Sequence, residues 1–155
     1  MRPRLRAVII GRDPPASLAE KVRVRGLDVR LTGFVDDIRP YVAGANVYVI
    51  PLFVGSGTRI KAFEAMAMGR PVVSTTLGVE GLDVTDGVDF LRADNADEFA
   101  ARILGLLTDA SMRARIAGAA RRLVEERFSW SRVADQFEAI CLRALETKID
   151  HAAGR

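Results

Sequence analysis

The sequence contains few of the residue types on which many catalytic and metal sites depend. Its 155 residues include one cysteine (Cys141), one histidine (His151) and only 6% aromatic residues. A lone cysteine excludes a disulfide framework within the chain and any metal site built from several cysteines. A lone histidine close to the C-terminus disfavours catalytic schemes that depend on histidine.

Long apolar runs are also absent. No segment approaches the roughly 18 consecutive apolar residues that a membrane-spanning helix needs. Residues 1–6 lead directly into a strand-like stretch, without the apolar core and cleavage site of a signal peptide. The sequence therefore predicts a cytoplasmic protein.

Lysine is scarce as well, since three of the 23 basic residues are lysines and the remaining 20 are arginines. The formal net charge is nevertheless only +3. Guanidinium groups suit phosphate, so the arginines are compatible with a phosphate or nucleic-acid ligand. They are spread along the whole chain and often stand beside acids, which favours an ordinary solvated surface.

What is present is the alternating pattern of an α/β protein. Hydrophobic residues make up 49% of the chain, and its length predicts a single domain over residues 1–155. Short β-branched runs alternate with helical periodicity, which predicts a Rossmann-like parallel sheet with helices on both faces and extra C-terminal helices. The predicted strands are 5–10, 29–32, 47–50, 71–75 and 90–92. The first of them is expected to be buried. The predicted helices are 17–24, 36–43, 58–68, 95–107, 109–124 and 129–148.

Residues that suit helix N-caps precede several of these helices. They are Asp36 or Asp37, Asn95, Asp109 or Ser111, and Ser129. The last predicted helix also carries an apolar stripe, which is usually core packing, with docking on another domain as the alternative. The stripe consists of Trp130, Val133, Phe137, Ile140, Cys141 and Ala144.

The most informative segment is 51–73, which reads as a strand end, a glycine-rich turn, a helix and another strand. In open α/β sheets, ligands bind beyond the carboxyl ends of the strands, where such turns lie. Gly55 and Gly57 let the backbone approach a ligand closely. The free N–H groups around Thr58 to Ile60 form an anion site at a helix N-terminus.

Two cations, Arg59 and Lys61, stand in the first turn of that helix. The helix dipole disfavours cations at this end, so a bound anion is expected to compensate for them. Glu64 follows in an otherwise apolar stretch. Its carboxylate has to be exposed or hydrogen-bonded, and two vicinal hydroxyl groups, as in a ribose, suit it as donors.

Taken together, these residues resemble the signature of family 4 glycosyltransferases, in the C-terminal, donor-binding half of their GT-B fold. The resemblance runs in order along nearly the whole chain. The matching segments are 8–11, 31–35, 45–51, 64–73, Glu80, 86–87 and 128–130.

The resemblance implies metal-independent transfer of a sugar from a nucleotide sugar with retention of configuration. It implies that Glu64 binds the ribose hydroxyls, that residues 55–58 and the helix start face the diphosphate and donor sugar, and that residues 34–35 line the base. Arg59 and Lys61 are the expected catalytic residues, because cations stabilise the departing diphosphate. The expected donor-binding residues are Gly11, Phe34, Val35, Gly55, Ser56, Gly57, Thr58, Ile60 and Glu64.

The sequence departs from the family pattern in three ways. Ser56 stands eight positions before Glu64, where the usual motif has a first glutamate, and is not assigned that role. The loop of this sequence instead resembles that of a branch of the family, which reads Gly-Gly/Ser-Gly-Thr-Arg-Ile-Lys. In that branch the cations that match Arg59 and Lys61 are expected at the phosphates. The first strand, basic glycine loop and helix of the half are absent, as is the N-terminal acceptor-binding domain. We therefore expect a fragment that is inactive alone.

The expected partners are a nucleotide sugar and the missing N-terminal domain, with no nucleic acid and no cofactor or metal. The resemblance also allows peripheral membrane association of the complete enzyme. The main alternative is a non-catalytic nucleotide-binding or scaffolding module with the same fold. A dinucleotide-binding domain is disfavoured because Gly11 is the single glycine of the turn after the first strand. A nucleic-acid module lacks stacking aromatics among its basic residues.

Overall fold

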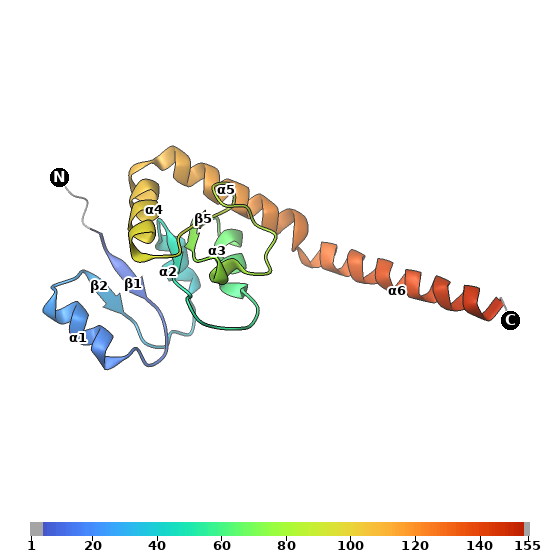
Figure 1. Cartoon of the computed structure of the whole chain (residues 1–155), viewed down its shortest axis with the longest axis horizontal. Coiled ribbons are helices and arrows are strands. Elements are labelled where there is room, and N and C mark those ends of the chain that lie inside the picture. The colour runs from blue at the N-terminus through green and yellow to red at the C-terminus, as the bar shows by residue number, and fades with distance from the viewer. Residues whose placement is uncertain (1–4, 154–155) are drawn as a thin grey trace. The chain divides into compact units, whose positions relative to one another are not determined.

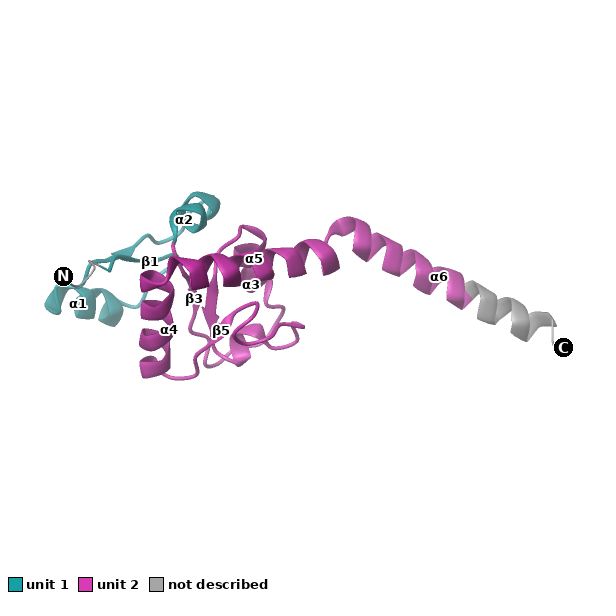
Figure 2. Ribbon diagram, turned by 90° about the horizontal axis from the view of Figure 1, so that it is seen from above, with its two compact units in different colours: residues 1–45 teal, residues 46–155 magenta. Residues whose placement is uncertain are grey.

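A computed structural model describes residues 5–153 of the chain, with side chains described up to residue 144. The chain divides into two compact units, Met1–Ala45 and Asn46–Arg155, coloured separately in Figure 2. Strands and helices alternate from β1 to α4, and two further helices follow (Figure 1). All paired strands are parallel, which confirms the predicted α/β class. The prediction of one domain over residues 1–155 stays a prediction.

Unit 1 is a small two-stranded βαβα arrangement. Its elements are β1 (Ala7–Ile9), α1 (Ala16–Val24), β2 (Val29–Leu31) and α2 (Arg39–Gly44). The expectation that the first strand is buried is wrong for this unit, because Val8 and Ile9 are exposed. A sheet of two strands has few neighbours that could cover both faces, and Val42 is the only buried side chain among residues 5–45.

Unit 2 contains a three-stranded sheet in the order β3-β4-β5. Its elements are β3 (Tyr48–Ile50), α3 (Ile60–Ala67), β4 (Val72–Ser74), the 3-10 turn η1 (Leu77–Val79), β5 (Leu91–Arg92), α4 (Ala96–Thr108), α5 (Ala110–Arg127) and α6 (Trp130–Ala153). Each strand matches a predicted one, within one to two residues at either end. The predicted parallel arrangement is therefore divided between a two-stranded and a three-stranded sheet.

The central strand β4 organises the core of unit 2, because successive strand residues point to opposite faces. Val72 packs in a cluster with Met66 of α3, whereas Val73 packs with Leu91 and with Leu106 of α4. All five side chains are completely buried or nearly so. Helices thus cover both faces of this sheet, as predicted.

Helix starts follow the predicted caps at three helices and differ at two others. Helix α6 begins at Trp130, directly after Ser129. The Asn95 side chain accepts a hydrogen bond from the Glu98 N–H at 3.0 Å, and Asp109 accepts one from the Met112 N–H at 2.8 Å. Helix α2 starts at Arg39, later than predicted, since Asp37 instead accepts the Arg39 N–H. Helix α3 starts at Ile60 rather than at residue 58.

The apolar stripe of α6 is not core in the described part of the chain. Trp130 is 89% exposed and Phe137 is 68% exposed, and Val133, Ile140, Cys141 and Ala144 are exposed as well. The core-packing interpretation is therefore wrong, because no described element covers this face. His151 lies outside the residues whose side chains are described.

The helices of the described residues are too short or too polar to span a membrane. None of those in the described residues combines the length and the apolar character that crossing a membrane requires.

Candidate functional site

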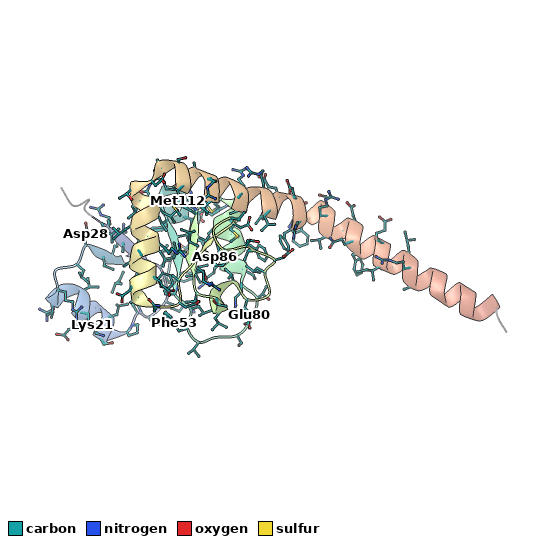
Figure 3. All side chains as sticks on the ribbon, turned by 45° about the horizontal axis from the view of Figure 1, so that its top comes forward. Lys21, Asp28, Phe53, Glu80, Asp86 and Met112 are labelled. Atoms are coloured by element: carbon teal, nitrogen blue, oxygen red, sulfur yellow. The ribbon has the colours of Figure 1, made fainter. Side chains whose placement is uncertain are left out.

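The predicted donor site of unit 2 lies beyond the carboxyl ends of its parallel strands. Residues 51–59 follow β3, residues 75–80 follow β4 and residues 93–94 follow β5. In parallel sheets these ends meet at one edge, where ligands bind. Phe53 and Glu80, labelled in Figure 3, both lie along this edge and line the same cavity.

The loop between β3 and α3 needs glycine at two positions. Gly57 has φ +97° and Gly55 has φ +155°, in the region that residues with a Cβ atom rarely adopt. A Cβ at Gly55 would also approach Leu52 Cδ1 to 3.2 Å. The glycines thus shape an exposed loop, in which Ser56 and Thr58 are exposed too.

The loop ends at the N-terminus of α3, which has neither a capping side chain nor an acid in its first turn. Arg59 is the cap residue, and Ile60 and Lys61 are the first two helical residues, both exposed. Because the first N–H groups of a helix have no intrahelical acceptor, they carry partial positive charge. The Ala62 N–H donates to the Arg59 carbonyl at 3.1 Å, which leaves the N–H groups of Ile60 and Lys61 as free donors, and the Lys61 side chain is exposed.

Arg59 differs from Lys61 in being buried. It is only 8% exposed, and its Nη2 lies 3.2 Å from Oε2 of Glu80, which follows η1. Its buried Nε has no hydrogen-bond partner. Leaving such a donor unsatisfied costs roughly 1–3 kcal/mol. A ligand atom that accepts a hydrogen bond from this Nε would remove that cost.

Glu64 lies one turn into α3 with its carboxylate exposed. Burial raises the pKa of the Tyr48 hydroxyl in β3, and the negative charge of Glu64 raises it further. No described side chain donates a hydrogen bond to the Glu64 carboxylate, so its oxygens are available to hydroxyl groups of a ligand.

A cavity of about 440 Å³ lies at the same sheet edge and was missed by the sequence analysis. Its lining residues are Leu52, Phe53, Thr75, Thr76, Leu77, Glu80 and Asp94. Glu80 was part of the family resemblance, but no role was predicted for it. No role was predicted for the other six lining residues either. The available signal for Thr76 and Asp94 was their position within two residues of the end of a predicted strand.

Asp94 is held in place by Thr76, which lines the same cavity. The Thr76 N–H donates to Asp94 Oδ1 at 2.7 Å, and the Thr76 hydroxyl donates to Oδ2 at 2.8 Å. These two hydrogen bonds hold the pKa of Asp94 below its usual 3.8. Among the described side chains, no group of three or more histidine, cysteine or acidic residues could hold a metal ion.

The remaining predicted site residues belong to unit 1. The Gly11 N–H donates to the Gly33 carbonyl at 3.3 Å, which brings the carboxyl ends of β1 and β2 together. Phe34 is exposed, and the Arg12 guanidinium lies 5.0 Å from its ring centroid. Val35 is half-buried. The predicted base-binding residues thus gather at one sheet edge of their own unit.

Comparison with known families finds one matching model, described as Glycosyl transferases group 1, over residues 1–109. Among curated proteins, the phosphatidyl-myo-inositol mannosyltransferase of Mycolicibacterium smegmatis is 30% identical over 99% of this chain and 42% of its own length. The D-inositol 3-phosphate glycosyltransferase of Salinispora tropica is 34% identical over 79% of this chain and 26% of its own. The chain thus spans less than half the length of these relatives.

Solved structures share the fold. The C-terminal domain of a glycosyl transferase group 1 family protein (LpcC) from Francisella tularensis is 25% identical, with a TM-score of 0.73 over 81% of this chain and 70% of that one. HepE from Anabaena, in complex with UDP, is 22% identical, with a TM-score of 0.80 over 91% of this chain and 42% of that one.

Proposed function

This chain belongs to the group 1 glycosyl transferases and has the fold of their GT-B C-terminal domain, and on that premise we propose that it is the donor-binding half of an enzyme that transfers a sugar from a nucleotide sugar to an acceptor. The observation that carries the proposal is the N-terminus of α3. Free N–H groups, the exposed Lys61 and the buried Arg59 meet there after a glycine loop, without any acid in the first turn.

The diphosphate of the donor binds at this terminus. Its oxygens accept from the first N–H groups of α3 and pair with Lys61, and Arg59 adds a guanidinium behind the loop. The unpartnered Nε of Arg59 supports this role, because a ligand or an ordered water has to satisfy it. Gly55 and Gly57 let the backbone approach the phosphates.

Residues of each unit are assigned to the nucleoside. Glu64 accepts hydrogen bonds from the ribose hydroxyls, a role supported by its exposed carboxylate. By the family resemblance, Phe34 and Val35 of unit 1 are assigned to the base, and the turn near Gly11 to the border of the same cleft. The UDP complex of a protein with the same fold supports a nucleoside diphosphate as the ligand.

The reaction that we propose is that of family 4, with retention of configuration and without a metal ion. The bond between the anomeric carbon and the diphosphate oxygen breaks, and the diphosphate leaves with the electron pair. An acceptor hydroxyl oxygen bonds to the anomeric carbon on the same face, and its proton passes to the departing diphosphate. Lys61, Arg59 and the N–H groups of α3 stabilise the charge that develops on it. Groups positioned before the reaction do this at no reorganisation cost, so no cofactor is needed.

A second domain completes the enzyme in this proposal. The relatives are more than twice as long as this chain, and α6 exposes an apolar face that includes Trp130 and Phe137. Burial of such a face against another domain is favourable by roughly 25 cal/mol per Å². That domain supplies the acceptor site, so this chain by itself binds the donor without turnover. The complete enzyme works in the cytoplasm, and the family resemblance allows its peripheral attachment to the membrane surface.

Isothermal titration of UDP, GDP, ADP and TDP into the wild-type chain, in metal-free buffer, tests the donor site. We expect one nucleotide to bind, and Lys61→Ala and Glu64→Ala each to weaken it about tenfold, the loss expected for a charge-assisted hydrogen bond. Lys21→Ala and Glu126→Ala are the matched controls, because both residues are exposed and lie outside the site. Equal affinities in all five proteins would disprove the site.

One observation supports an alternative function: Ser56 stands where the family has its first glutamate. A non-catalytic nucleotide-binding or scaffolding module would bind the same nucleotide. It would, however, never transfer sugar when joined to an acceptor-binding domain. A turnover assay on the complete protein, with the sugar released to water or to acceptor as readout, separates the two.

A further inference from the structure

The cavity at the carboxyl ends of β3, β4 and β5 differs in chemistry from the terminus of α3. The α3 terminus offers cations and N–H donors, whereas the cavity offers the carboxylates of Glu80 and Asp94. Carboxylates are acceptors only and repel phosphate oxygens. A ligand of the cavity therefore has to bring hydrogen-bond donors of its own.

Each carboxylate of the cavity has a nearby arginine. Glu80 is paired with Arg59 at 3.2 Å, and the charge of Arg92 lowers the pKa of Asp94 in addition to the hydrogen bonds from Thr76. Arg92 is itself paired with Asp86 at 3.9 Å, so these two arginines and three carboxylates leave one negative charge. An anionic ligand is therefore disfavoured, and a neutral ligand with hydroxyl groups supplies hydrogen-bond donors without the cost of removing water from a cation.

The rest of the lining is apolar or aromatic. Leu52 and Leu77 contribute aliphatic wall, and Phe53 is 58% exposed. The Phe53 ring rests edge-on against Phe99, with the ring centroids 6.4 Å apart, so its position is fixed by packing. Carboxylates beside an anchored aromatic ring suit a sugar, whose hydroxyls donate while its C–H groups contact the ring.

The cavity is formed in advance by hydrogen bonds between its loops. The Thr75 hydroxyl donates to the Leu52 carbonyl at 2.6 Å and accepts the Gly78 N–H at 3.0 Å. Gly78 packs so closely that a Cβ there would lie 2.3 Å from Ser74 Oγ. These contacts tie the loop after β3 to the loop after β4, so little conformational entropy is lost when a ligand binds.

We propose that this cavity binds a neutral monosaccharide unit, with Glu80 and Asp94 accepting its hydroxyl hydrogens and Phe53 contacting its ring. Its volume lies within the usual range of small-molecule sites. The assignment rests on the proposed function in one respect: the sugar is taken to be that of the nucleotide donor. Glu80 then links the two parts of the site, because it contacts both the sugar and the Arg59 that supports the diphosphate.

Amide chemical shifts of the isotope-labelled full chain test the cavity directly. Free glucose, galactose and mannose are titrated separately, and we expect at least one to move the signals of Thr76 and Asp94 saturably. Asp94→Asn should weaken that response about tenfold, since it removes a charged acceptor. Asp97→Asn is the matched control, because Asp97 is exposed and does not line the cavity. Phe53→Leu should weaken the response too, which keeps the test valid if Asp94→Asn folds poorly.

The same spectra separate failure of the cavity from failure of the proposed function. UDP and GDP should move signals at residues 55–61, and the matching nucleotide sugars should move Thr76 and Asp94 in addition. If nucleotides leave residues 55–61 unchanged while free sugar still moves the cavity signals, the donor site is wrong and the cavity stands. The cavity proposal is overturned if no sugar and no nucleotide sugar moves Thr76 or Asp94, or if ethanolamine, a small cation, moves them more strongly than any sugar.

Discussion

The N-termini of α3 and α4 lie in the same unit and follow opposite rules. Helix α4 begins with the Asn95 cap and has Asp97 and Glu98 in its first turn, as the helix dipole favours. Helix α3 has no side-chain cap and carries Lys61 at the helical position that Asp97 occupies in α4. One helix start is therefore built for stability, and the other leaves its donors and cations free for a ligand.

The two helix starts also differ in whether their polar groups have hydrogen-bond partners, as Arg59 shows. A buried guanidinium needs an acceptor, and Glu80 supplies one from a loop that is 21 residues away in sequence. The Nε of Arg59 is left without a partner, whereas the Asn95 cap at the start of α4 is satisfied. We take the unmet hydrogen bond at α3 as the place of a phosphate oxygen.

Charge reversal at α3 should have the largest effect. Lys61→Glu places an acid among the N–H groups that bind the diphosphate, so we expect the affinity for the preferred nucleoside diphosphate to fall about 100-fold or more. Isothermal titration measures the loss, with Lys21→Glu as the control for net charge. An affinity within about threefold of the wild type would show that α3 is not the phosphate site.

Removal of the cap at α4 should have the next largest effect, and only on stability. Asn95→Ala leaves the Glu98 N–H without its acceptor, so the free energy of unfolding should fall by about 1 kcal/mol. Urea denaturation followed by circular dichroism measures it, and nucleotide affinity should stay unchanged. A matching loss of nucleotide affinity would mean that the two helix starts do not have separate roles.

Charge reversal at α4 should have a smaller effect, with the sign that the dipole dictates. Asp97→Lys gives α4 the cation that α3 carries at the same position, so it should destabilise the fold by roughly 0.3–1 kcal/mol at low salt. The effect should shrink as salt is added, because the residue is exposed. A salt-independent change would point to lost packing rather than to the dipole.

The smallest expected effect is a dependence of stability on pH that comes from Asp94, just before α4. The pKa of Asp94 is lowered in the folded chain by the two hydrogen bonds from Thr76, so its contribution to stability is present above the unfolded value of 3.8. That contribution is lost as the pH falls through the lower, folded pKa. Melting curves between about pH 6 and pH 3 should therefore converge for wild type and Asp94→Asn. Curves that stay parallel would contradict this account of Asp94.

Local patterns predicted what depends on neighbours in sequence. The caps Asn95 and Asp109, the order of strands and helices, and the glycine loop before α3 could all be found from short spacings. The burial of Arg59 could not be predicted in this way. Its ion pair with Glu80 depends on how two loops that are distant in sequence come together. The cavity was missed for the same reason, since three separate strand ends build it.

The two apolar segments that were judged wrongly share another cause. An apolar stripe such as that of α6 has the same spacing whether it packs into a core or faces a second domain. Trp130 is therefore exposed although its spacing suits a core residue, and Ile9 is exposed although it lies in an apolar strand. Periodicity identifies a face to be covered, and only the structure tells what covers it.

The contrast between the two helix starts is tested most directly by melting wild type and Lys61→Glu with and without the nucleoside diphosphate that binds. Without nucleotide, the variant should be at least as stable as the wild type, because an acid suits a helix N-terminus. With nucleotide at about 100 times its dissociation constant, the wild type should gain about 2.7 kcal/mol and the order should reverse. If the wild type is the more stable protein under both conditions, or if nucleotide stabilises both equally, the terminus of α3 is not the anion site.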